Sequence, residues 1–389
     1  MANYISSNAN RFYVALETAY GQAAGISAAN RFPAVQLSAQ QVLEQNNRRD
    51  KTGSRTFLGT PKTARRNTAF ELKTYLTSWS GAGAPSYGPL FQAAMGAPPA
   101  SSGGLTIQGT PQPTTIQTTT PHGLAFGAGV SYNNEIRFAV AFPDISTLTL
   151  NAPFSVTPLT GARLASTVTY SLSAFLPSVT LYDYWDPISA VRRVITGAAV
   201  DSLDLAVNGD LHEFTFRGPG ADIVDSSSFV AGLAGLAEFP TEPDSSRFDY
   251  SVVPGHLGQA WIGLSENQFF TLTSASVGLK NHLELRRREF GATLPRAISP
   301  GARQVLTDFS LLAQDDAQTI GLYQAARSRT PVPAMLQLGQ AQGQLMGVFL
   351  PNVTPELPLY DDGQARLEWD FHQCQAQGQT DDELFIAFA

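Results

Sequence analysis

One charged stretch of this chain occurs twice, and an internal repeat constrains the architecture of a long chain more than any single motif does. The first copy runs from Arg48 to Leu72, and the second runs from Arg287 to Leu311, about 240 residues later. Each copy has two basic residues and an acid, ten further residues, a proline, and then the pattern Thr-x-Phe-x-Leu in the same register. The repeat predicts a duplicated β unit in which a long charged loop leads into a strand.

The residues around each copy extend this repeat. Apolar alternation predicts strands over 35–44 and 67–76 on either side of the first loop. A loop of about 20 residues is uncommon in a compact domain unless it is functional or disordered, and its recurrence favours function. Short helix signals follow in both copies, at 88–98 and 316–327. The sequence thus predicts strand, long loop, strand and helix, in that order, twice.

The rest of the chain indicates a mainly β fold made of two tandem sandwich or barrel-like domains, each with one short helix, plus a small inserted β module. The first domain is predicted over 1–225 and is interrupted by the module at 101–163; the second is predicted over 226–389. Further expectations are an N-terminal arm over 1–30, strands at 167–175, 200–207 and 213–217, a hairpin turn at Asn208-Gly209-Asp210, a linker over 226–249, a strand segment over 335–348, and a last strand at 367–371.

The composition limits the possible partners. Charged residues are only 15% of the chain, against roughly 25% in ordinary soluble domains, so we expect extensive surface to be buried against other subunits. The net charge of −7 disfavours a basic field that could hold nucleic acid. The sequence shows no apolar run of about 18 residues and no signal peptide, which predicts synthesis and assembly in the cytosol without membrane contact.

Motifs for catalysis or metal binding are not found in the sequence. The single cysteine, Cys374, excludes a cysteine-rich zinc site, and the five histidines lack metal-ligand spacing. No nucleophile elbow or phosphate-binding glycine loop occurs. Acidic clusters at 315–316, 361–362 and 381–383 match no calcium loop, and they are either solvated turns or partners for the basic loops. We therefore expect no enzyme activity, no cofactor and no metal.

The basic residues of the two loops carry the strongest functional signal. They are either solubilising or contact an acidic face on another copy of the protein, and head-to-tail contacts of that kind generate rings or filaments. DNA binding is disfavoured because no aromatic residues interleave the basic ones. The candidate contact residues are Arg48, Arg49, Lys51, Arg55, Arg65 and Arg66 in the first copy and Arg287, Arg288, Arg296 and Arg303 in the second, with Lys62 and Arg286 beside them.

Several segments, in this order, resemble the major tail tube proteins of long-tailed bacteriophages, particularly their duplicated, two-tube-domain versions. The segments are Val14-Ala15-Leu16-Glu17-Thr18-Ala19-Tyr20-Gly21, the strand–loop–strand–helix of the first copy, residues 194–203, Leu350-Pro351-Asn352-Val353, and Asp361-Asp362-Gly363 with the aromatic strand after it. His122-Gly123-Leu124 with Gly127 is similar to small β modules of phage structural proteins.

This resemblance implies a structural virion protein of the tail, assembled in the host cytoplasm. The sheets of neighbouring subunits would join around a lumen, the loops at 46–66 and 287–303 would contact the adjacent ring, and three duplicated chains would form a pseudo-hexameric ring. DNA would pass through the lumen without specific binding during genome ejection. Expected partners are other copies of the chain and the tail terminator, tape measure and distal tail proteins, and the inserted module would decorate the outside of the tube.

Two alternatives remain open at this point. The chain could be another tail or neck component, such as a minor tail or adaptor protein, that forms a single ring. It could also be an enzyme such as a β-sandwich glycosidase, which requires two carboxylates about 5–10 Å apart in a cleft.

Overall fold

The computed structural model describes residues 4–44, 50–56, 59, 64–79, 83–207, 209–244, 250–263, 269–363 and 365–389. The fold is mainly β, as the sequence predicts, with 45% of the residues in strands and 7% in helices. The helices are α1 (Gly88–Met95) and α2 (Ala317–Ser328), and short 3-10 turns lie at η1 (Ala28–Asn30) and η2 (Leu233–Gly235).

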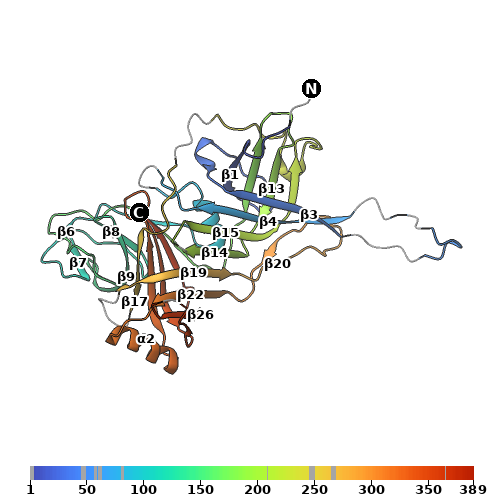
Figure 1. The fold of residues 1–389 in the computed structure, drawn as a ribbon. Helices are drawn as coiled ribbons and strands as arrows, with labels where there is room; N and C mark the ends of the chain where they lie inside the picture. Colours follow the sequence, from blue (N-terminus) through green and yellow to red (C-terminus); the bar gives the residue numbers. More distant parts are fainter. Residues whose placement is uncertain are drawn as a thin grey trace.

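The largest sheet is curled and runs through both predicted domains. Its main path follows the order β18-β17-β23-β24-β26-β22-β19-β14-β15-β4-β3, and β5, β11, β25 and β27 pair at its side (Figure 1). The bounds along the path are β18 Phe269–Phe270, β17 Gly258–Ile262, β23 Val332–Leu338, β24 Met346–Thr354, β26 Glu368–Ala376, β22 Gln304–Leu312, β19 Leu272–Lys280, β14 Ser202–Val207, β15 His212–Gly220, β4 Arg65–Tyr75 and β3 Gln36–Glu44. The others are β5 Ala100–Ser102, β11 Thr167–Ser171, β25 Leu359–Asp361 and β27 Phe385–Phe388.

A second sheet covers part of the largest one and forms a sandwich with it. Its order is β16-β13-β12-β1-β2, with bounds β16 Asp222–Asp225, β13 Arg193–Ala198, β12 Val179–Trp185, β1 Asn10–Leu16 and β2 Arg31–Phe32. Residues 10–16 were expected to lie in an arm, but they form an inner strand between β12 and β2. The segment forms a strand in the interior because both of its faces pack against other residues. Tyr13 is buried in the tyrosine cluster on one face, and Val14 is buried in the main core on the other.

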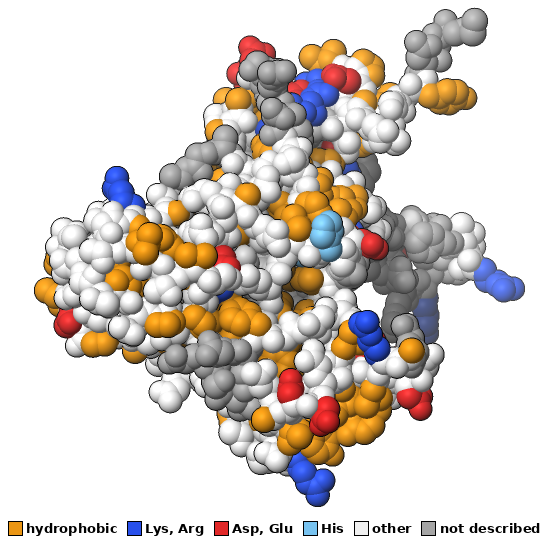
Figure 2. All heavy atoms as spheres, turned by 60° about the vertical axis from the view of Figure 1, so that its left-hand side comes forward, with side chains coloured by type: hydrophobic (Ala, Val, Ile, Leu, Met, Phe, Trp, Pro, Cys, Tyr) orange, Lys and Arg blue, Asp and Glu red, His pale blue; other side chains and the backbone are white. Residues whose placement is uncertain are grey.

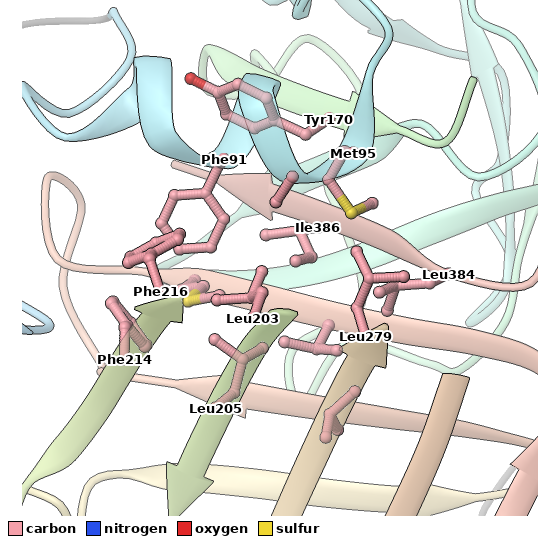
Figure 3. Packing of buried hydrophobic residues seen from close by; sticks show 14 of the residues in the cluster. Phe91, Met95, Tyr170, Leu203, Leu205, Phe214, Phe216, Leu279, Leu384 and Ile386 are labelled. Carbon is pink, nitrogen blue, oxygen red and sulfur yellow. The ribbon is translucent and has the colours of Figure 1, made fainter. Parts of the chain in front are cut away.

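The main core lies between these sheets and around α1. Phe91 on α1 packs edge-on against Phe214 and Phe216 of β15, with ring centroids 5.5 and 5.3 Å apart (Figure 3). Leu203, Leu279 and Ile386 lie in the same cluster, and they come from both predicted domains. One continuous core therefore joins the two halves of the chain.

The predicted hairpins around the two loops are present and have matching registers. Strand β4 pairs with β3 so that Phe70 faces Ala39. Strand β22 pairs with β19 so that Phe309 faces Ala275. The strands of both hairpins are antiparallel, and in each the Thr-x-Phe-x-Leu residues face the core. The sequence repeat thus corresponds to a structural repeat, and β14 pairs antiparallel with β15 as the predicted hairpin requires, although Asn208 of its turn lies outside the described residues.

The segment 226–249 was expected to be a linker, but its described part is folded back onto the second sheet. Phe229 and Phe239 pack against each other and against the tyrosine cluster that contains Tyr13. Glu242 forms an ion pair with Arg11. These aromatic side chains cover the outer face of the sheet, which explains why a segment rich in Ser, Gly and Pro is held in place. The predicted strand over 335–348 is likewise two strands, β23 and β24, separated by a turn.

The inserted module has its own sheet and its own small core. The sheet order is β6-β7-β10-β9-β8, with bounds β6 Ile107–Gln108, β7 Thr115–Thr118, β10 Thr147–Leu150, β9 Glu135–Asp144 and β8 Gly129–Tyr132. Phe138 of β9 stacks on Phe349 of β24 at 5.1 Å. Beside this contact, Arg137 is fully buried and donates hydrogen bonds to Gln337 at 3.0 Å and Gln259 at 2.9 Å. The module is thus fixed to the second half of the chain.

Candidate functional site

The first charged loop extends beyond the body of the molecule. Figure 1 shows residues 50–56 well away from the sheets, at the right of the view. Lys51 and Arg55 are exposed there. Arg48 and Arg49 lie outside the described residues. Arg65 begins β4, half-buried, opposite Glu44 of β3.

The second charged loop, between β19 and β22, lies against the base of the first. It contains the short antiparallel pair β20 (Glu284–Leu285) and β21 (Ile298–Ser299). Arg287 and Arg288 form ion pairs with Glu44 at the end of β3, at 3.3 and 3.8 Å. The backbone N–H of Arg66 donates to the Thr293 carbonyl at 2.9 Å. The two loops, predicted as separate equivalents, therefore meet within one chain.

An arginine anchors the base of each loop to an acid on the neighbouring segment. Arg66, near the start of β4, donates two hydrogen bonds to Asp222, which follows β15, at 3.0 and 2.8 Å. Arg303, just before β22, pairs with Asp381 at 2.8 Å and Glu383 at 3.4 Å, which follow β26. Strand β15 lies beside β4, and β26 lies beside β22, so these ion pairs occupy equivalent places in the two repeats.

These contacts divide the predicted loop residues into two groups. Arg66 and Arg303 hold their own chain together, as bidentate or partly buried ion pairs do. Arg288 and Arg296 remain mostly exposed, although Arg296 lies 3.6 Å from Glu289. Of the acids that anchor the loops, Asp381 and Glu383 belong to the cluster at 381–383 that the sequence suggested as a partner for the basic loops, whereas Asp222 was not singled out. Their common position after the strand beside each Thr-x-Phe-x-Leu strand is the signal that could have identified them.

One face of the curled sheet carries mainly polar side chains and is not covered by the second sheet. Alternate residues of β14, β19, β22 and β26 line a shallow hollow of about 220 Å³ at its centre, and they include Asp204, Ser276, Gly278, Leu306, Asp308 and Gln373. Further along, the exposed or half-buried residues of this face include Gln36, Ser38, Gln40, Val42, Ala69, Glu71, Lys73, Tyr75, Glu213, Arg217, Lys280, Gln304, Ser310, Leu312 and Gln375. Small hydroxyl and amide groups and a few charges thus make up most of this face, and Tyr75 at the end of β4 is an aromatic side chain among them.

The basic side chains of this polar face are neutralised by carboxylates. Arg217 pairs with Glu71 at 2.8 Å and with Asp204 at 2.6 Å. The hydrogen bond from Arg217 lowers the pKa of Glu71, which keeps that carboxyl ionised at neutral pH. Lys73 lies 3.6 Å from Glu213, and Lys280 lies 2.5 Å from Asp201. The face therefore offers a phosphate group no unneutralised cluster of cations.

The titratable groups that could support chemistry have structural roles. The His122 ring accepts a hydrogen bond from the Leu124 N–H at 3.0 Å and stacks on Phe142, as expected for a turn residue. Burial lowers the pKa of His212. Burial raises the pKa of the Cys374 thiol to about 11. Within the described ranges, no three His, Cys, Asp or Glu side chains gather as metal ligands would. No helix in the described part of the chain is long and apolar enough to cross a membrane.

Comparison of the sequence with models of protein families and with curated proteins gives no match. The arguments for function rest on the duplicated hairpin, the polar sheet face and the two charged loops.

Proposed function

We propose that the chain is a structural subunit that polymerises into a hollow tube, and that the tube is a virion tail tube through which DNA passes. The observation that carries this proposal is the order β3-β4-β15-β14 followed by β19-β22-β26-β25 in one sheet. Each group starts with the repeated hairpin, and neighbouring strands are antiparallel throughout. Two repeats therefore follow one another head to tail, in the same direction.

Head-to-tail addition of like units continues until a ring closes. Three chains would supply six such repeats, which gives a trimer with pseudo-sixfold symmetry. The curl of the sheet supports closure around a channel because a curled sheet extended by equal units returns to its start.

The polar sheet face suits the wall of a channel for DNA. The hydrogen bond from Arg217 lowers the pKa of Glu71 on this face, its cations are paired with carboxylates, and the chain carries a net charge of −7. Phosphates that meet no free cations release no counterions on contact, so DNA would slide without being held. The inserted module packs on β23, β24 and β27 at the far end of the sheet, and its surface shows few charged side chains (Figure 2). On this proposal, the module lies on the outside of the tube.

The two charged loops would contact the next ring of the stack. Residues 50–56 extend beyond the sheets, and Arg288 and Arg296 present exposed guanidinium groups near the base of that loop. An Arg-rich projection on a charge-poor, acidic protein fits an acidic face of another copy.

Electron microscopy of the purified full-length protein tests the proposal. Long hollow tubes built from threefold rings would support it. Discrete rings would instead indicate a single-ring tail or neck component. A protein that stays monomeric at high concentration and has a deep carboxylate-lined cleft would contradict both.

Charge reversal tests the role of the loops. The variant with Arg48, Arg49, Arg287 and Arg288 changed to Glu should lose ring stacking while its thermal unfolding changes little, because surface ion pairs such as those of Arg287 and Arg288 with Glu44 contribute little to stability. Arg327→Glu, on α2, serves as a control that should leave tubes intact. Unchanged tube length in the loop variant would refute the stacking role.

A further inference from the structure

We infer that β3 of one chain pairs with β25 of a second copy, in the register that the chain itself uses where its two repeats meet. This inference rests on the proposed function and deepens it by assigning the strands and residues of the contact between chains. Among the described strands, β3 pairs with β4 alone and β25 pairs with β26 alone, so each has an open edge. Open edges of this kind are liabilities in a monomer unless they are covered by a partner.

The junction inside the chain provides the template. There, β14 of the first repeat pairs with β19 of the second, and Leu203 faces Leu279. Both leucines are buried, with 1% of their surface exposed. Helix α1 lies over them, with Phe91 packed in the same cluster (Figure 3). The junction thus consists of two paired strands, an apolar cross-strand pair and a covering helix.

The matching hairpins show which residue of β3 corresponds to Leu279. Ala39 faces Phe70 in the first repeat, and Ala275 faces Phe309 in the second. Leu43 lies as many residues after Ala39 as Leu279 lies after Ala275, so the two leucines occupy equivalent positions in the two repeats. Leu43 also lies on the core-facing side of β3, because it follows the alternation set by buried Leu37.

The same comparison shows which residue of β25 corresponds to Leu203. Phe216 faces Leu72 in the first repeat, and Trp369 faces Leu311 in the second. Leu203 faces Phe216, and Tyr360 faces Trp369. Tyr360 therefore occupies the place of Leu203. If two chains pair in the same register as the internal junction, Tyr360 of one chain faces Leu43 of the next, as Leu203 faces Leu279 within the chain.

The exposure of these two residues agrees with a partner that is absent from the single chain. Leu43 is 52% exposed and Tyr360 is 58% exposed, whereas their counterparts in the internal junction are buried. Tyr360 is already stacked on Trp369 at 5.5 Å, and Tyr323 of α2 contacts the same indole at 5.7 Å. Helix α2 thus stands beside the open edge, as α1 stands over the internal junction. Burial of apolar side chains favours association, so Leu43 and Tyr360 at these two exposed positions favour pairing between chains.

Disulfide cross-linking tests the register. Leu43→Cys and Tyr360→Cys are combined in one chain with Cys374→Ser, and the assembled protein is oxidised mildly. Directly opposed residues on paired strands bring their Cβ atoms to about 4.5–5.5 Å, close to the separation that a disulfide requires. The two positions lie at opposite edges of one sheet, so any cross-link joins two chains. We expect covalent multimers on a non-reducing gel that end at the trimer.

The control variant carries Val42→Cys in place of Leu43→Cys. Neighbouring residues of a strand point to opposite faces, so Val42→Cys with Tyr360→Cys should not cross-link. Rings or tubes that form without the 43–360 cross-link would overturn this register and leave the proposed function standing. A 43–360 cross-link in a species that electron microscopy shows as neither ring nor tube would support the pairing and contradict the tube. A protein that neither assembles nor cross-links at any concentration would overturn both.

Discussion

Single buried polar residues fix how the parts of this molecule join. Arg137 uses all five of its N–H groups on the carbonyls of Pro153 and Ile136 and the side chains of Glu135, Gln259 and Gln337. Burial lowers the pKa of Arg137 to about 10, and the carboxylate of Glu135 opposes this shift. A charge that is fully satisfied in this way specifies one orientation of the module on the second half of the chain.

Removal of this guanidinium should destabilise the protein strongly. Arg137→Ala leaves the buried Glu135 carboxylate without its cation and removes the donors to the Pro153 carbonyl and the Gln259 side chain, and we expect a loss of about 3–5 kcal/mol of unfolding free energy. Denaturant unfolding monitored by circular dichroism measures this difference in unfolding free energy. Arg163→Ala, an exposed arginine of the same module, is the matched control and should stay within about 0.5 kcal/mol of the parent. Equal effects of the two substitutions would contradict the role of Arg137.

Cys374 should be unreactive in the folded protein. The thiol is completely buried in β26, and its pKa of about 11 leaves little thiolate at pH 8. We expect iodoacetamide to modify it only after unfolding. Gln375→Cys with Cys374→Ser moves the thiol to the exposed neighbouring position and should react readily in the native state. Full modification of native parent protein within the same time would show that Cys374 is accessible.

At the scale of elements, the first repeat depends on a close contact between backbone segments. Strand β15 crosses the segment between β13 and β14 at Gly218. A methyl group at this position would lie 1.9 Å from the Ala199 carbonyl oxygen and 2.9 Å from the Asp201 nitrogen. Because both atoms belong to the backbone, they cannot be moved aside by a side-chain rotation.

Gly218→Ala should therefore destabilise the first repeat by about 1–3 kcal/mol or more, as overpacking does. Gly278→Ala on β19 is the matched control, since its added carbon would meet only the Asp204 carboxyl at 3.4 Å and the Leu306 carbonyl at 4.0 Å. Gly278→Ala should leave the unfolding free energy unchanged or raise it by about 0.4–1 kcal/mol, because alanine reduces the conformational entropy of the unfolded chain. Thermal unfolding of both variants compares them. A tolerated Gly218→Ala would indicate that β15 and the 199–201 segment are not in close contact.

At the scale of the whole molecule, the curled sheet has a polar face that the second sheet leaves uncovered, and the inserted module has a sheet of its own. On the proposed arrangement, the polar face lines a channel, while the inserted module faces outward. This assignment predicts which positions become inaccessible when the protein assembles.

Labelling with a bulky polymer-linked maleimide distinguishes the two sides. In the Cys374→Ser background, Gln375→Cys on the polar face should react in the monomer and become protected in long tubes, because the reagent cannot pass along the channel. Thr120→Cys, exposed on the module, should react equally before and after assembly. Protection of Thr120→Cys with continued reaction of Gln375→Cys would reverse the assignment of the two sides.

The sequence alone determined the local parts of this protein. The alternation of apolar residues predicted the mainly β class. The repeated Thr-x-Phe-x-Leu pattern predicted the second strand of each hairpin, which begins at Arg65 in the first repeat and at Gln304 in the second. Helices α1 and α2 were also predicted near their observed bounds, and the antiparallel pairing of β14 with β15 was predicted as a hairpin. These features are set by side-chain periodicity and turn residues within a few residues of one another, which is the range that a sequence pattern reports.

Only the tertiary structure decided how these parts are joined. The pairing of β14 with β19, the place of β1 inside the second sheet, and the ion pairs of Arg66 with Asp222 and of Arg287 with Glu44 all connect residues far apart in the chain. Their formation depends on which surfaces remain available after the local elements have formed. Strand edges carry the same backbone groups whatever their sequence, so the order of strands in the sheet is fixed by the packing of the whole chain.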